Sequence, residues 1–175
     1  FSAMAYWRDF VMQPILLKGF LEKRESVLAA LIGGGRQVDL EIEDDIPTVR
    51  TDPNYLEVAL NALAIHAQQD LAARETLRIS CRLADTGGQV IKRGVMSKYP
   101  MHVAVIGVEM SGRVVSAAAT AAALSSHGPS GQSTASLMGL WLLKQFAKAS
   151  SGDILVEALP RKRYRLSIAL PVRLR

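Results

Sequence analysis

The clearest signal in the chain is the stretch DPNYLEVALNALAIHAQQDL, residues 52–71. It opens with Asp52 and Pro53, residue types that are favoured at the N-cap and in the first turn of a helix. Apolar residues then recur at steps of three and four residues, along one stripe: Leu56, Ala59, Leu60, Leu63, Ala67 and Leu71. We predict a helix here whose apolar stripe packs against a core.

Two further elements are predicted on the N-terminal side of this helix. Residues 14–33 carry apolar side chains at near-helical spacing between Pro14 and the glycine triplet 33–35, which predicts one helix. Residues 38–43 alternate apolar and acidic side chains, a pattern typical of a strand with one face in water. Residues 44–47 end this strand.

The C-terminal side predicts the rest of a sheet. Residues 77–83 and 101–108 are predicted strands, joined by a linker rich in Gly and Lys over 87–100. Residues 111–133 are small and polar, which indicates a mobile loop with at most a short alanine-rich helix. A helix over 136–149 precedes strands at 154–159 and 164–170, which a basic turn at 160–163 connects. This order predicts an α/β fold, a two-layer sandwich whose mixed sheet is covered on one face by helices.

The composition is that of an ordinary globular domain: 175 residues, 49% hydrophobic and 21% charged. Apolar runs such as 117–124 are far shorter than the roughly 20 residues that cross a bilayer, so no membrane span is expected. The lone Cys81 can form no internal disulfide and fits a reducing compartment, and we expect a cytoplasmic protein. The chain begins with Phe1 without a leader-like segment, which suggests a fragment of a longer protein.

The net charge is +5, and basic side chains concentrate near the C-terminus while acids concentrate in residues 37–57. Nucleic-acid binding favours cations interleaved with aromatic rings, whereas the basic stretch 153–175 contains only one aromatic residue, Tyr164. We therefore interpret its charged cluster between the two final strands as a solvated turn and expect no nucleic-acid partner.

The order of elements and several strings resemble the ATP-binding domain of sensor histidine kinases, in the superfamily that also contains gyrase, MutL and a class of heat-shock chaperones. The string IPTVRTDPNYLE (46–57) resembles the start of the family's asparagine-box helix. GLWLLKQ (139–145) and SGDILVE (151–157) resemble its last glycine box, helix and penultimate strand, and YRLSIALP (164–171) resembles its closing strand. The resemblance runs from about Gly19 to Leu170 and implies a Bergerat-type sandwich. We take residues 1–35 as an N-terminal helical segment, the expected end of an upstream dimerisation or linker region, and residues 36–175 as the ATPase-like domain.

The resemblance also implies where nucleotide contacts would lie, and the asparagine box departs from the family pattern. His66 stands where the magnesium-binding asparagine belongs, Ala62 at a second polar position and Gln69 at a phosphate-contacting basic position. Helical spacing places these three residues within one narrow arc, so the face that would meet nucleotide is altered.

The two glycine boxes are altered as well. The first, an aspartate followed by x-Gly-x-Gly, would correspond to EMSGR (109–113). There Glu109 replaces the adenine-binding aspartate, and Ser111 and Arg113 replace both glycines on either side of Gly112. In the second box Gly139 remains and is followed by Leu140, while Ala135 and Leu137 stand at glycine positions. Side chains there would fill the space of the phosphates.

Other candidates have simpler explanations. The string DTGG (85–88) resembles an adenine-binding motif, but only one predicted strand separates it from the asparagine-box helix, and a turn explains it better. His66, His102 and His127 show no metal-ligand spacing, so no metal site is expected. Residues 1–33 contain no histidine that could accept phosphate.

Two functions follow from the resemblance. The leading hypothesis is a degenerate ATPase-like domain, a pseudo-kinase of a two-component phosphorelay, with no cofactor or only weak Mg-ATP. Its expected partners are a helical dimerisation or phosphotransfer domain or a response regulator, with a homodimer formed through upstream helices. The alternative is an active sensor histidine kinase domain that binds ATP and phosphorylates a histidine upstream of this chain, with residues 111–133 as its ATP lid.

Overall fold

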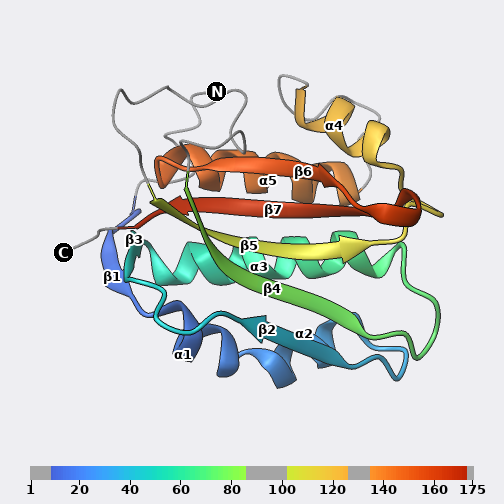
Figure 1. Ribbon diagram of the computed structural model, residues 1–175, viewed down its shortest axis with the longest axis horizontal. Helices are drawn as coiled ribbons and strands as arrows, with labels where there is room; N and C mark the ends of the chain where they lie inside the picture. The colour runs from blue at the N-terminus through green and yellow to red at the C-terminus, as the bar shows by residue number, and fades with distance from the viewer. Residues whose placement is uncertain (1–8, 86–101, 126–134, 173–175) are drawn as a thin grey trace.

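A computed structural model describes residues 9–85, 102–125 and 135–172. Its main sheet has five strands in the order β2-β4-β5-β7-β6 (Figure 1). These strands are β2 (Val38–Ile42), β4 (Leu77–Asp85), β5 (His102–Met110), β6 (Asp153–Ala158) and β7 (Tyr164–Pro171). β2 pairs with β4 in parallel and the remaining pairs are antiparallel, so the sheet is mixed as predicted.

Helices cover one face of this sheet (Figure 1). They are α1 (Leu17–Glu22), α2 (Glu25–Ile32), α3 (Pro53–Gln68) and α5 (Ala135–Ala149), and α4 (Ala117–Ser125) lies beyond the sheet edge that ends in β6. Apolar side chains of the helices and of alternate strand positions form one continuous core: for example Leu21, Leu60, Leu63, Phe146, Ile106 and Ile168. The prediction of a two-layer α/β sandwich is therefore confirmed.

The helix α3 begins as the sequence predicts. The Asp52 carboxylate accepts hydrogen bonds from the backbone amides of Asn54 (2.8 Å) and Tyr55 (3.3 Å). Its other oxygen accepts one from the amide of Val11 (2.8 Å), which ties the first described residues to this helix. A buried capping aspartate thus fixes both the start of α3 and the path of the chain before it.

The prediction of one helix over residues 14–33 was wrong. Pro14 lies in a short strand, β1 (Gln13–Ile15), that pairs with β3 (Val49–Thr51), and two short helices follow it. Proline has no backbone N–H to donate. It fits a peripheral strand because one edge of such a strand is not paired and needs no donor. Residues 15–32 still contribute Ile15, Leu17, Leu21, Leu28 and Ile32 to the common core.

The other predicted elements lie within a few residues of their observed bounds. The segment expected to be a loop with a short alanine-rich helix contains α4, and residues 126–134 lie outside the described part. The linker 87–100 lies outside it too. No helix in the described part of the chain is long and apolar enough to cross a membrane.

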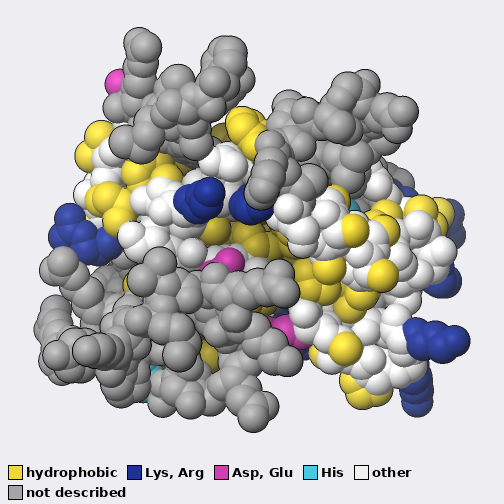
Figure 2. All heavy atoms as spheres, turned by 90° about the horizontal axis from the view of Figure 1, so that it is seen from above, with side chains coloured by type: hydrophobic (Ala, Val, Ile, Leu, Met, Phe, Trp, Pro, Cys, Tyr) yellow, Lys and Arg dark blue, Asp and Glu magenta, His cyan; other side chains and the backbone are white. Residues whose placement is uncertain are grey.

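The described surface is mixed in character. Seen from above, exposed hydrophobic side chains lie beside Lys and Arg (Figure 2). Large hydrophobic residues with more than half of their surface exposed are Val11, Leu16, Val27 and Val114. The helix layer itself exposes Leu31 on α2 and Val58 and Ile65 on α3.

Candidate functional site

His66 is buried where α3 meets α4 and the start of β7. Its Nε2 atom lies 3.4 Å from the hydroxyl of Thr120, and that hydroxyl lies 3.1 Å from the Tyr164 hydroxyl. All three residues are at most 1% exposed. Burial lowers the pKa of His66 to about 4, against an opposing effect of the Asp70 charge, so the imidazole is neutral near pH 7.

The helix α4 is held over His66 by its own polar contacts. Thr120 is its buried residue, and the other side of the helix is largely exposed. The Ser116 hydroxyl accepts a hydrogen bond from the Ala119 amide (3.0 Å) at the start of the helix. At its end the Lys144 ammonium of α5 donates to the Leu124 carbonyl (2.7 Å). The helix is therefore fastened to α3, α5 and β7 although its own hydrophobic pattern is weak.

The arc predicted on α3 divides between the interior and the surface. Ala62 and His66 are buried, whereas Gln69, the C-cap residue of the helix, is exposed. The structure therefore brings His66 to the interior beside Thr120 and leaves Gln69 on the outer side.

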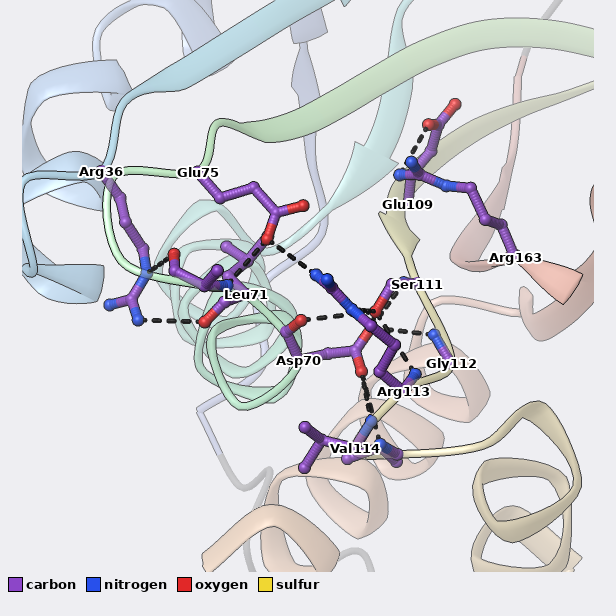
Figure 3. A network of polar contacts seen from close by, with 12 residues as sticks. Arg36, Asp70, Leu71, Glu75, Glu109, Ser111, Gly112, Arg113, Val114 and Arg163 are labelled. Atoms are coloured by element: carbon purple, nitrogen blue, oxygen red, sulfur yellow. Dashed lines mark hydrogen bonds and ion pairs between the residues drawn. The ribbon is translucent and has the colours of Figure 1, made fainter. Parts of the chain in front are cut away.

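Asp70 is the residue that sequence reasoning missed. It follows Gln69, the C-cap of α3, and is only 3% exposed. Its carboxylate accepts hydrogen bonds from the loop after β5 (Figure 3). One oxygen accepts from the amides of Ser111 and Gly112 (2.9 Å) and from the Ser111 hydroxyl (2.6 Å). The other accepts from the amides of Val114 (2.8 Å) and Val115 (3.4 Å). A signal was present, since Asp70 stands four residues after His66 and three after Ala67, on the buried face of the helix.

Burial by itself would raise the pKa of Asp70, because it disfavours the charged form. The hydrogen bonds from the Ser111 hydroxyl and from the loop amides outweigh that effect, and the net result is a lowered pKa. Asp70 is therefore a carboxylate whose charge is satisfied within the chain.

The contacts of Asp70 continue outward to the surface. The Ser111 hydroxyl accepts a hydrogen bond from the Arg113 guanidinium (3.1 Å), and that guanidinium pairs with Glu75 (3.2 Å). Glu75 also accepts from the Ala72 amide (2.7 Å) (Figure 3). The loop after β5 is thus tied to the segment after α3 by side chains from both.

Glu109 lies on the face of the sheet that points away from the helices. It pairs with Arg165, its neighbour across the β5–β7 ladder (3.2 Å), and with Arg163 (3.5 Å). The next residue, Met110, points toward the helices and is 1% exposed. Successive strand residues alternate between faces, so the structure separates Glu109 from His66 and places Met110 on the helix side.

The structure requires glycine at one of the two glycine-box positions, 112 and 139, but not at the other. Gly112 has φ +77°, and a Cβ there would lie 2.9 Å from the Lys162 carbonyl oxygen, so both the conformation and the space favour glycine. Gly139 has no such need, since a Cβ would meet Ala62 at an ordinary 3.8 Å. Leu140 is 2% exposed and belongs to the core. The side chains of Ala135 and Leu137 lie outside the described part.

The remaining candidates do not join this site. His102 lies at the opposite end of β5 from Met110, and Thr86–Gly88 and His127 fall outside the described residues. Across the described part of the chain no group of His, Cys, Asp and Glu residues is arranged to hold a metal ion. The site as it stands offers a neutral buried imidazole and a fully bonded carboxylate, which suit packing and loop closure.

Solved histidine kinases share this fold. Full-length ShkA, in a crystal structure with AMPPNP, superposes with a TM-score of 0.67 at 16% identity over 94% of this chain, which corresponds to 32% of ShkA. The Acinetobacter baumannii histidine kinase AdeS gives 0.56 at 15% identity, covering 94% of this chain and 68% of that one. A histidine kinase from Burkholderia phymatum STM815 gives 0.59 at 14% identity, covering 94% and 72%.

Sequence comparison alone finds no such relation. No family model matches the chain, and no curated protein matches it either. The chain spans about a third of ShkA, the first of the structures named above. At this level of identity the likeness is one of fold, and it agrees with the fold that the resemblance implied.

Proposed function

We propose that this chain is a degenerate ATPase-like domain of a bacterial two-component signalling protein, which acts through contacts with other proteins and binds Mg-ATP weakly or not at all. The fold shared with histidine kinases supports the assignment to this kind of domain. The state of the site supports the loss of nucleotide chemistry.

The observation that carries the proposal is the burial of His66 beneath Thr120. The resemblance assigns this position to a magnesium ligand, and Mg²⁺ prefers oxygen ligands and keeps several of its waters. A neutral imidazole that is 1% exposed and faces a threonine hydroxyl offers neither an oxygen ligand nor room for those waters. Mg-ATP would have to displace α4 before it could reach this face.

A second argument comes from the adenine side of the expected site. The Glu109 carboxylate forms ion pairs with Arg163 and Arg165 on the face of the sheet away from the helices. If the motif is shifted by one residue, Gly112 falls on its first glycine and Met110 on its aspartate. A thioether is only a weak acceptor, so Met110 cannot take the place of a carboxylate toward an adenine amino group.

The proposed partners are helical dimerisation or phosphotransfer domains and response regulators, with dimerisation through helices upstream of this chain. What supports a docking role is the exposure of Val27 and Leu31 on α2 and of Val58 and Ile65 on α3, each at least 37% exposed. Exposed apolar residues on a helix layer suit contact with another helical surface.

The test is calorimetric titration of the folded chain with ATP and ADP, with and without magnesium. ShkA titrated with AMPPNP under the same conditions is the positive control, because that complex has been crystallised. We expect no saturable heat from this chain while thermal melting shows a cooperative transition. Magnesium-dependent binding with micromolar affinity would overturn the proposal.

The alternative function is an active kinase domain in which α4 moves aside as a lid. It is favoured by one observation: Gly112 has a left-handed conformation in the loop that corresponds to the family's first glycine box. Autophosphorylation of a longer chain that includes an upstream histidine hairpin tests it. Transfer of the γ-phosphate to that histidine would establish the kinase, and its absence from a folded chain would count against it.

A further inference from the structure

The loop Ser111–Val115 directs its backbone amides toward one point. The amides of Ser111, Gly112, Val114 and Val115 all donate to the Asp70 carboxylate, and the Ser111 hydroxyl joins them (Figure 3). The left-handed conformation of Gly112, φ +77°, permits this arrangement because it turns neighbouring amides to the same side of the chain.

Amides that converge in this way form a binding site for an oxyanion. Proteins use such concave backbone segments for phosphate and carboxylate groups, since several partial positive charges meet one negative charge. Here the anion comes from the end of α3, more than forty residues earlier in the chain. The loop bonds to the carboxylate through both oxygens, as it would to a bound ligand.

We propose that Ser111–Val115 is an oxyanion-binding loop whose ligand is the chain's own Asp70 carboxylate. An external carboxylate or phosphate group reaches these amides only when Asp70 is displaced or removed. This inference deepens the proposed function, because amides that already bind Asp70 are not free to bind a nucleotide phosphate. Only this link to nucleotide binding rests on the proposed function.

The occupied loop also bears on α4. Residues 111–116 lead directly into that helix, whose Thr120 covers His66. A loop that is closed on Asp70 therefore positions the helix that closes the site. Asp70 acts as a positioning residue, through the loop and not by contact with a ligand.

The experiment is rescue of Asp70→Ala by formate. This substitution removes the carboxylate but keeps Cβ, so formate has the size of the missing group. We expect the melting temperature to fall by about 10 °C, because several amides lose a charged acceptor. Formate should then recover roughly half of that loss relative to chloride at matched ionic strength, since it binds the folded state alone.

Two control variants make the rescue specific. Asp70→Asn fills the same space but presents an amide group to donors, so it should lose stability and gain nothing from formate. Asp44→Ala removes an aspartate whose side chain is 84% exposed, and its melting temperature should respond to neither the substitution nor formate.

The proposal is overturned if Asp70→Ala melts like the wild type, or if formate restores it no better than chloride. If the variant does not fold, amide hydrogen exchange in the wild type decides instead. Strong protection of the Gly112 and Val114 amides supports the bound loop, and exchange at the rate of an open loop refutes it.

These readouts are independent of nucleotide binding. Rescue by formate can succeed while the wild type binds Mg-ATP, which would sink the proposed function alone. Formate can equally fail to restore the melting temperature while ATP titration of the wild type shows no binding, which would overturn the oxyanion-loop proposal alone.

Discussion

Arg82 and Glu157 form an ion pair of 2.7 Å although β5 and β7 lie between their strands. Glu157 also receives Arg165 (3.7 Å), which pairs in turn with Glu109 (3.2 Å). A row of alternating charges therefore crosses the sheet on the face away from the helices. These side chains are between 19% and 29% exposed, so water screens them only in part.

Gly107 makes room for this row, and we predict that Gly107→Ala destabilises the protein. A Cβ there would lie 2.8 Å from Cδ and 2.9 Å from Cγ of Arg165 and would collide with the Ser167 hydroxyl. We expect a loss of about 1–3 kcal/mol in the free energy of unfolding, measured by urea denaturation. Gly19→Ala in α1 is the control, because a Cβ meets nothing within 4 Å there, and it should be neutral or stabilising. Equal effects of the two substitutions would contradict the prediction.

Arg36 joins the ends of α2 and α3, and we predict that Arg36→Ala loosens both. Its guanidinium donates to the carbonyls of Ile32 (2.9 Å), Leu71 (3.1 Å) and Ala72 (3.2 Å). The Ile32 carbonyl also accepts from the Gln68 side chain (3.0 Å), so the substitution chiefly removes the donor to the Leu71 and Ala72 carbonyls. We expect a loss of about 1–3 kcal/mol in the free energy of unfolding. The check is the midpoint of chemical denaturation. Arg50→Ala, at an exposed position on β3, should leave that midpoint within experimental error, and a wild-type midpoint for Arg36→Ala would refute the role.

The Thr120 hydroxyl fastens α4, and we predict that Thr120→Val releases the helix. Valine keeps the shape but leaves the Tyr164 hydroxyl without its Thr120 partner in a buried place. The expected loss is about 1–3 kcal/mol, together with faster hydrogen exchange in α4. Thr120→Ser keeps the hydroxyl and should retain slow exchange. If both variants exchange alike, the hydroxyl does not hold the helix.

The buried imidazole of His66 predicts a loss of stability in mild acid. Its folded-state pKa is about 4, below the ordinary value of 6.5, so between these values the unfolded chain binds the proton more readily. The contribution of the neutral His66 to the free energy of unfolding should therefore be fully present above pH 6.5. It should be lost as the pH decreases toward 4, which lowers the free energy of unfolding by up to about 3 kcal/mol.

Denaturation series at pH 7, 6 and 5 measure this slope. His66→Gln should flatten the slope of stability against pH in that range, because it removes the imidazole that takes up the proton. Asp70 does not replace this effect, since its pKa is lowered and it takes up a proton only at more acidic pH. An unchanged slope in His66→Gln would assign the acid sensitivity to another group.

Much of the layer arrangement was predictable. The apolar stripe and capping aspartate of α3 are local features, and the same is true of the alternation in β2 and of the final strands, so these elements were found close to their observed bounds. The helix predicted over 14–33 failed because Pro14 is held in a strand by pairing with residue 50, a partner that local spacing does not reveal.

The site was harder to predict for the same reason. Glu109 and Met110 are adjacent in sequence but lie on opposite faces of the sheet, so an alignment of the first glycine box that shifts by one residue exchanges the two faces. Asp70 was not singled out from the sequence, because its role depends on a loop more than forty residues later that bonds to its carboxylate. Its spacing from His66 and Ala67 indicates the buried face, but the spacing does not reveal that the loop amides converge on its carboxylate.

Periodicity and capping act over a few residues, and for that reason the amino-acid order alone determined α3, α5, the five strands of the main sheet and the two layers, but not β1, β3 or the break between α1 and α2. The tertiary structure decided which side chains meet: Thr120 with His66, Asp70 with the loop after β5, Glu109 with its arginines. Such contacts depend on strand register and on how distant segments close on one another. Strand register and loop closure are properties of the whole chain, so these contacts contribute to stability only once the chain has folded.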